Sequence, residues 1–209
     1  MKKIALLLLS ISAFASAQMT AAVMNIQKQW AITNYQTAED EKEDVFEVLA
    51  KSATQVVLDD AKNAHALVWE GIVYSTYAGE AGALTAGKLA KHAKKSYEQA
   101  IKIDGSALNG SAYTSLGVLY YKVPGWPLSF GSDKKAMKQL KKGLEFNPDG
   151  IDSNYFFAEF LYEEEGEYAL AKEHLLKAQN AAARPTRPIA DEGRHKDIVQ
   201  LMKKIEKKL

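Results

Sequence analysis

The chain contains no cysteine, which excludes disulfide bonds, thiolate metal sites, a cysteine nucleophile and the acylated cysteine of a lipoprotein anchor. Its charge is nearly balanced, since 27 Lys and Arg residues face 26 Asp and Glu residues, a net charge of +1. The charge balance therefore gives no case for nucleic acid as a partner. After the first 17 residues, no segment approaches the roughly 20 apolar residues that a membrane-spanning helix needs. These absences predict a protein that is soluble unless a partner holds it.

Catalytic and metal-binding motifs are also missing. The four histidines, His65, His92, His174 and His195, are scattered, and none stands in an H-E-x-x-H pattern. The sequence has no G-x-S-x-G elbow, P-loop or G-x-G-x-x-G pattern. We therefore predict no catalytic residues, no metal site, no cofactor and no enzymatic activity. An enzyme with a site unlike any known motif stays as an alternative.

The first residues have the layout of a secretory signal peptide. Lys2 and Lys3 form a positive end, residues 4–14 are apolar, and residues 15–17 read Ala-Ser-Ala, a small-residue cleavage site. This pattern predicts a signal peptide over residues 1–17 and a mature chain that begins at Gln18. The expected location is the periplasm or the exterior of a bacterium.

From there to the end of the chain, apolar residues recur at helical spacing and no segment alternates with a period of two. No glycine- or proline-rich linker is long enough to divide the chain. We expect one all-α domain over residues 18–209. Two helical stripes come first, one with Ile26 and Trp30 and one that runs from Val45 to Val57.

A repeat begins near residue 110. Tyr113, Leu116, Gly117 and Tyr120 have the aromatic-x2-Leu-Gly-x2-Tyr spacing that opens a tetratricopeptide repeat, or TPR, and Ala136, Leu140, Gly143 and Pro148 follow at the spacing of its second helix. Small residues at Gly117 and Ala136 would let two antiparallel helices approach closely. The chain thus resembles a TPR array.

Similar spacings recur on both sides of this unit. The resemblance implies three helical hairpins, over approximately residues 64–104, 110–148 and 152–183. The C-terminal stripe of Ile198, Leu201, Met202, Ile205 and Leu209 predicts a capping helix with a polar outer face. The expected fold is a TPR-like helical-hairpin solenoid with additional N-terminal helices and this C-terminal cap.

A narrower resemblance covers residues 110–200. The segment "VPGWPLSFGSDKKAMKQLKKGLEFNPDGIDSNYFFAEFLYEEEGEYALAKEHL", with "RPTRPIADEGR" after it, is similar to the periplasmic T component of TRAP transporters. The resemblance implies an exported, helical, non-enzymatic protein that binds a partner, proposed in that family to be a solute-binding subunit, with trimers as one known assembly. T components are commonly lipoproteins, and this chain lacks the cysteine for that anchor.

An insertion, residues 121–135, separates the two helices of the middle repeat. Its prolines and glycines restrict and bend the backbone, while Trp126 and Phe130 supply apolar surface. We expect a rigid flap whose aromatics converge with Tyr121, Phe156 and Phe160 on one apolar cleft for a peptide, a protein element or a small ligand. The alternative is that these aromatics only cover the core.

Three arginines, Arg184, Arg187 and Arg194, form a second candidate site. Guanidinium groups could hold a carboxylate or phosphate. Alternatively, they pair with nearby carboxylates such as Asp191 and Glu192 or close a helix end.

The sequence thus predicts an exported interaction subunit, a scaffold or adaptor, that binds a partner protein or ligand through its TPR groove. The resemblance adds association with a solute transport system. A structural subunit of a homo-oligomer without a groove of its own is the alternative.

Overall fold

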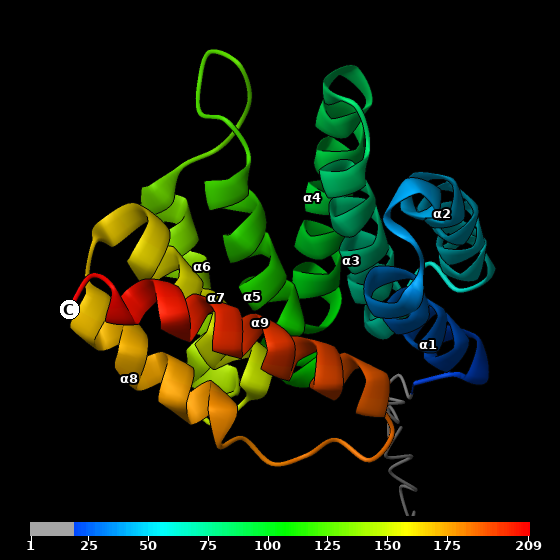
Figure 1. Cartoon of the computed structure of the whole chain (residues 1–209). Helices are drawn as coiled ribbons and strands as arrows, with labels where there is room; N and C mark the ends of the chain where they lie inside the picture. Colours follow the sequence, from blue (N-terminus) through cyan, green and yellow to red (C-terminus); the bar gives the residue numbers. More distant parts are fainter. Residues whose placement is uncertain (1–18) are drawn as a thin grey trace, which may run out of the picture.

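A computed structural model describes residues 19–209 of the chain. The predicted signal peptide and its cleavage site at Ala17 lie outside the described residues. Within residues 19–209, nine α-helices and two short helical turns follow one another (Figure 1). They are α1 (Ala21–Gln36), the 3-10 turn η1 (Glu39–Glu41), α2 (Lys42–Asp59), α3 (Ala64–Glu80), α4 (Ala83–Asp104), α5 (Ala107–Lys122), α6 (Asp133–Phe146), α7 (Ile151–Phe160), the π-helical turn η2 (Leu161–Glu165), α8 (Tyr168–Gln179) and α9 (Pro188–Glu206).

Side chains at the breaks determine where several helices begin. The hydroxyl of Thr20 accepts a hydrogen bond from the backbone amide of Val23 at the start of α1. At the start of α3, the side-chain oxygen of Asn63 accepts one from the amide of Ala66. Such caps satisfy amide groups that have no partner within the helix. The polar residues between the apolar stripes therefore act as helix starts.

The fold is all-α and TPR-like, as predicted. The pairs α3 with α4, α5 with α6, and α7 with α8 are antiparallel hairpins that follow one another along the array, and α1 and α2 precede them (Figure 1). Small residues allow close approach within the hairpins. A Cβ atom at Gly117 would lie 2.7 Å from Cγ of Leu140, and one at Gly71 would overlap the ring of Tyr97.

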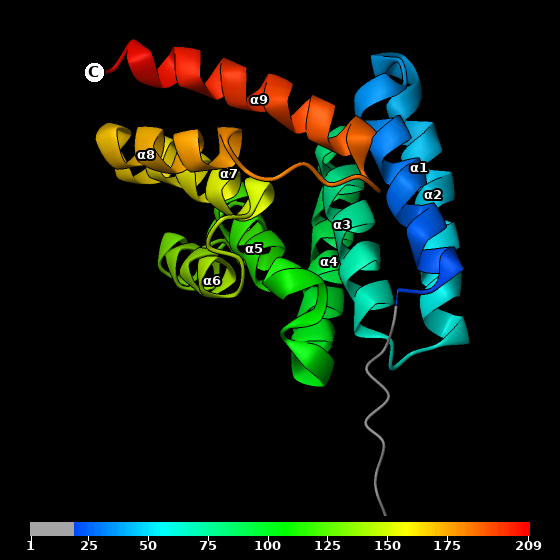
Figure 2. The same cartoon turned by 90° about the horizontal axis from the view of Figure 1, so that it is seen from below.

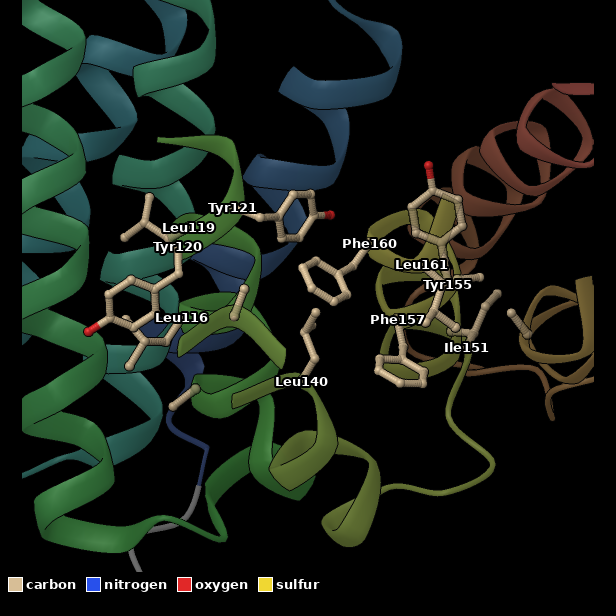
Figure 3. Packing of buried hydrophobic residues seen from close by; sticks show 14 of the residues in the cluster. Leu116, Leu119, Tyr120, Tyr121, Leu140, Ile151, Tyr155, Phe157, Phe160 and Leu161 are labelled. Carbon is tan, nitrogen blue, oxygen red and sulfur yellow. The ribbon is translucent and has the colours of Figure 1, made fainter. Parts of the chain in front are cut away.

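Two apolar clusters hold the array together. One, around Trp30, Phe46 and Trp69, joins α1, α2 and α3. The larger one joins the three hairpins with α9, and its fully buried members include Tyr97, Leu140 and Phe160. Figure 3 shows side chains of α5, α6 and α7 that meet in this second cluster.

Helix α9 begins beside α1, crosses the array and covers α7 and α8 as a C-terminal cap (Figure 2). At that crossing the ring of Tyr35 occupies the space where a Cβ atom of residue 193 would lie, so only glycine fits at Gly193. The hydroxyl of Tyr35 donates a hydrogen bond to Asp197, 3.2 Å away. The last helix therefore links the two ends of the array.

The start of α5 departs from helical geometry. Leu108, Asn109 and Gly110 have φ values of 49°, 54° and 72°, in the left-handed region. Glycine adopts this region freely and asparagine tolerates it, but leucine does so at a cost. This turn places Leu108 and Asn109 on the wall of the cleft described below.

Candidate binding cleft

A cleft of about 970 Å³ lies on the inner side of the array. Its walls come from α1, α3, α4, α5, α7 and α9, from the link before α9 and from the insertion. The apolar part of the lining includes Trp30, Trp69, Ile72, Val118 and Phe156. Ligand pockets typically have volumes of about 300 to 1,000 Å³ and mostly apolar walls. The cleft is therefore large enough for a small organic ligand or for an element of a protein partner.

Two tryptophans form one wall. The rings of Trp30 and Trp69 are 5.8 Å apart between centroids and tilted by 59°. Nε1 of Trp30 donates a hydrogen bond of 2.9 Å to the hydroxyl of Thr76 on α3, which fixes the orientation of its ring. Nε1 of Trp69 is buried and has no hydrogen-bond partner among residues 19–209. This wall therefore has one tryptophan held by a hydrogen bond and one buried donor without a partner in the described residues.

A cluster of charged groups forms another part of the lining, and Asp152 is at its centre. Its Oδ2 accepts a hydrogen bond of 2.6 Å from Nη1 of Arg184, and its Oδ1 accepts one of 3.0 Å from Nε of Arg194. Burial by itself would raise the pKa of Asp152, but the charges of Arg194, Arg184 and Arg187 outweigh it and hold that pKa well below its usual value. Asp152 is therefore ionised at neutral pH.

Two of the arginines are held by hydrogen bonds to carboxylates. Nε of Arg184 donates to Asp191 at 2.6 Å, and the backbone amide of Arg184 donates to the same carboxylate at 2.7 Å. The guanidinium of Arg194 lies 4.3 Å and 4.5 Å from the ring centroids of Tyr155 and Phe156. This stacking and the bond to Asp152 fix Arg194 in the wall of the cleft.

Asp197 connects Arg194 to the N-terminal helix. Its Oδ2 accepts hydrogen bonds from Nη1 of Arg194, at 3.0 Å, and from the hydroxyl of Tyr35. Burial raises the pKa of Tyr35 to about 12, so its hydroxyl stays protonated and can donate. The charged cluster thus joins α7 and α9 to α1.

Arg187 differs from the other two arginines. Its Nη1 is 3.7 Å from Oδ2 of Asp152, beyond hydrogen-bond distance, and its Nε is buried without a partner among residues 19–209. Its guanidinium lies 5.3 Å from the ring centroid of Trp69. Burial lowers the pKa of Arg187, and Asp152 offsets only part of that effect. The arginines predicted as one group therefore separate into two that donate hydrogen bonds to carboxylates and one, Arg187, whose guanidinium has no hydrogen-bond partner among the described residues.

The pairing partners predicted for the arginines are partly correct. Asp191 does pair with Arg184, whereas Glu192 forms its ion pair with Lys196. Sequence reasoning missed Asp152, which comes from a different hairpin. No local signal marks it, because the fold alone brings it to the link before α9.

The structure does not bring the five predicted aromatics together on one cleft. Phe156 lines the cleft, but Phe160 is completely buried and Tyr121 nearly so, and their ring centroids are 5.4 Å apart in the core (Figure 3). The hydroxyl of Tyr121 donates to Glu159 at 2.6 Å. Phe160 therefore cannot touch a ligand in this arrangement.

The insertion divides the remaining two aromatics. Phe130 packs edge-on against Tyr120 with a centroid distance of 6.0 Å, so it covers the core. Trp126 belongs to the loop that connects α5 to α6 and projects beyond these helices (Figure 1), and 89% of its surface is exposed. The loop is closed by a backbone hydrogen bond of 3.0 Å from the amide of Gly131 to the carbonyl of Pro124. Val123, Pro124, Leu128 and Ser129 of the insertion line the cleft.

A second polar cluster lies between α2, α3 and α4, outside the cleft. Glu70 is buried and accepts hydrogen bonds from the hydroxyls of Ser96 at 2.7 Å and Thr54 at 3.0 Å, and His92 Nε2 lies 3.1 Å from it. Burial raises the pKa of Glu70, but these partners outweigh it and the pKa is lowered. This cluster joins three helices and is a structural network.

Residues 19–209 include no helix long and apolar enough to cross a membrane. In the same part of the chain, no group of three or more His, Asp or Glu side chains could hold a metal ion.

Comparison with known proteins gives two crystal structures of MamA as similar folds. One is 20% identical with a TM-score of 0.47, covering 83% of this chain and 95% of that one. The other is 18% identical with a TM-score of 0.45, covering 90% and 93%. No family model and no curated protein sequence matches the chain. The fold assignment therefore rests on the helical hairpins themselves, and the resemblance to TRAP T components stays a sequence-based prediction.

Proposed function

We propose that this protein is an exported binding subunit that captures a partner protein or a ligand in the cleft, without catalysing a reaction. The observation that carries the proposal is the cleft itself, whose largely apolar walls come from helices far apart in the sequence. Helical-hairpin arrays present concave surfaces of this kind to their partners. The predicted signal peptide supports a location in the periplasm or outside the cell.

A blocked cleft tests this function. Gly87 lines the cleft from α4, and a Cβ atom there would meet no atom within 4 Å. The substitution Gly87→Trp therefore fills part of the cleft without straining the helix. Gln99→Trp places the same side chain at an exposed position of α4 that does not line the cleft, and is the matched control.

Both variants and the original protein are used as bait in periplasmic extract, with pull-down for proteins and native mass spectrometry for small ligands. We expect Gly87→Trp to lose the partner and Gln99→Trp to retain it. Equal capture by all three proteins would contradict binding in the cleft.

The sequence resemblance of residues 110–200 makes a periplasmic solute-binding subunit the first partner to test. This part of the proposal rests on that resemblance alone. If the captured proteins include no such subunit while cleft-dependent capture persists, the association with a transporter is wrong and the binding function stands.

A second candidate function is self-assembly. Three large apolar side chains are mostly exposed: Leu84 in the first turn of α4, at 93%, and Trp126 and Leu128 on the insertion, at 89% and 83%. Trp126 and Leu128 lie two residues apart on the same loop, and neighbouring exposed apolar side chains favour a contact site. Light scattering measures the molar mass in solution and tests this function. Self-assembly through the insertion predicts that the original protein is an oligomer and that the double variant Trp126→Ser, Leu128→Ser is a monomer. A monomeric original protein would contradict it.

A further inference from the structure

Arg187 lies in the cleft without an acceptor of its own. Its Nε is buried with no hydrogen-bond partner among the described residues, and its Nη1 is 3.7 Å from Asp152. Both oxygens of Asp152 already accept hydrogen bonds, one from Arg184 and one from Arg194. Within the described residues, the Arg187 guanidinium therefore has one long ion-pair contact and no hydrogen-bonded acceptor.

Other unused donors lie near Arg187. Nε1 of Trp69 is buried and unpartnered within residues 19–209, and the Arg187 guanidinium lies 5.3 Å from the centroid of this ring. Nη2 of Arg184 is also buried without a partner in that range. All three residues line the cleft. Buried donors without acceptors are costly, so a group that accepts several hydrogen bonds would be stabilised here.

Two basic side chains of the lining lack a carboxylate, within the described part of the chain, that accepts a hydrogen bond from them. Five basic side chains and two acidic ones, Asp152 and Asp197, are among the described residues of the cleft wall. Lys122 and Arg184 also have acidic partners outside the lining: Glu159 and Glu163 for Lys122, and Asp191 for Arg184. Lys91 has no ion pair within residues 19–209, and Arg187 has only the long contact with Asp152. Lys91 and Arg187 are therefore the two basic side chains of the lining that no carboxylate of the described residues holds by a hydrogen bond.

The walls beside Arg187 favour a ligand with an apolar body. Trp69, Trp30 and Ile72 lie along α1 and α3 within the same cleft, and the cleft volume of about 970 Å³ is far more than an inorganic ion would fill. A guanidinium fork matches the planar geometry of a carboxylate, which accepts two parallel hydrogen bonds.

We propose that the cleft binds a small organic carboxylate, with its carboxylate on Arg187 and its apolar body along Trp69 and Ile72. This inference rests on the proposed function and names the class of ligand that the cleft takes. It assigns Arg187 the binding role and leaves Arg184 and Arg194 as structural groups held by Asp152.

Isothermal titration calorimetry with decanoate tests the proposal, and decanol and inorganic phosphate serve as matched probes. Decanoate has both the carboxylate and the apolar chain, decanol has the chain without the charge, and phosphate has the charge without the chain. We expect decanoate to bind and both other probes to bind at least about tenfold more weakly. Equal affinity for decanoate and decanol, or tighter binding of phosphate, would overturn the proposal.

Substitutions of Arg187 test whether this residue binds the carboxylate. Arg187→Gln is expected to weaken decanoate binding by about 10- to 100-fold, because charge-assisted hydrogen bonds are lost. Arg187→Lys keeps the charge without the fork and should recover part of the affinity. Lys141→Gln removes an exposed charge outside the cleft and should bind as the original protein does. Unchanged binding in Arg187→Gln would overturn the assignment.

The two proposals fail separately. If Gly87→Trp loses the captured partner while decanoate does not bind the original protein, the cleft functions in binding and the carboxylate inference is wrong. If decanoate binds in an Arg187-dependent manner and partner capture is equal in Gly87→Trp and Gln99→Trp, the inference stands and the proposed capture function is wrong.

Discussion

Replacing Gly117 by alanine tests the close approach of α5 and α6. The added methyl carbon would lie 2.7 Å from Cγ of Leu140 and 3.0 Å from its backbone nitrogen. The leucine side chain can turn aside, but the nitrogen moves only if α6 moves. Overpacking of this kind costs about 1 to 3 kcal/mol. Alanine gains up to about 1 kcal/mol over glycine within a helix, which offsets part of that cost.

The matched control is Gly87→Ala in α4, where the added methyl group meets no atom within 4 Å. It has the same gain in helix propensity and no overpacking. Gly117→Ala should therefore be about 1 to 3 kcal/mol less stable than Gly87→Ala. At this chain length the difference corresponds to roughly 2 to 12 °C in Tm. Urea unfolding followed by circular dichroism at 222 nm measures it, and Gly117→Ala at least as stable as Gly87→Ala would refute the packing.

Four further predictions follow from the described contacts and from the N-terminal pattern. Asp152→Asn should lower the free energy of unfolding in urea by about 2 to 3 kcal/mol, because Arg184 and Arg194 lose a carboxylate partner. The loss is smaller than for a fully buried ion pair because 30% of the Asp152 side chain is exposed. A loss below about 0.5 kcal/mol would contradict the central role of Asp152. Folding lowers the pKa values of Asp152 and Glu70, so their ionised forms add stability that is present above about pH 4 and lost at lower pH. In a plot of unfolding free energy against pH, Asp152→Asn should reduce the loss of stability at acid pH, and an unchanged loss would contradict this effect of Asp152. Phe160→Ala should cost about 3 to 5 kcal/mol, whereas the exposed Trp126→Ala should leave thermal stability unchanged, and similar losses in both would show that the insertion is part of the core. Intact mass of the exported protein should correspond to a chain that begins at Gln18, and retention of residues 1–17 or an attached lipid would contradict the signal peptide.

The repeated hairpins could be predicted from the sequence because their signals are local. Gly117, Leu116 and Tyr120 lie within one helix, and Leu140 lies on the helix paired with it. A small residue at one position and large ones at its helical neighbours determine which faces meet. Helical spacing placed Phe156 and Phe160 on one helix face. It could not indicate that Tyr121 packs against Phe160 in the core while Phe156 lines the cleft.

The charged cluster could be predicted only in part, because its contacts join distant segments. Arg184 and Asp191 are seven residues apart, and their pairing was within reach of sequence reasoning. Asp152 lies 32 residues from Arg184, and Tyr35 lies 162 residues from Asp197. These contacts depend on the path of α9 across the array, which no periodicity of its own residues encodes.

The central claim, that the partner occupies the cleft, is tested most directly by site-specific photocrosslinking in periplasmic extract. A photoreactive p-benzoylphenylalanine replaces Gly79, which lines the cleft from α3 with no atom within 4 Å of a Cβ there, or replaces Gln99, which is exposed and does not line the cleft. The account predicts a crosslinked species from position 79 and none from position 99. Crosslinking from position 99 with none from position 79 would contradict it.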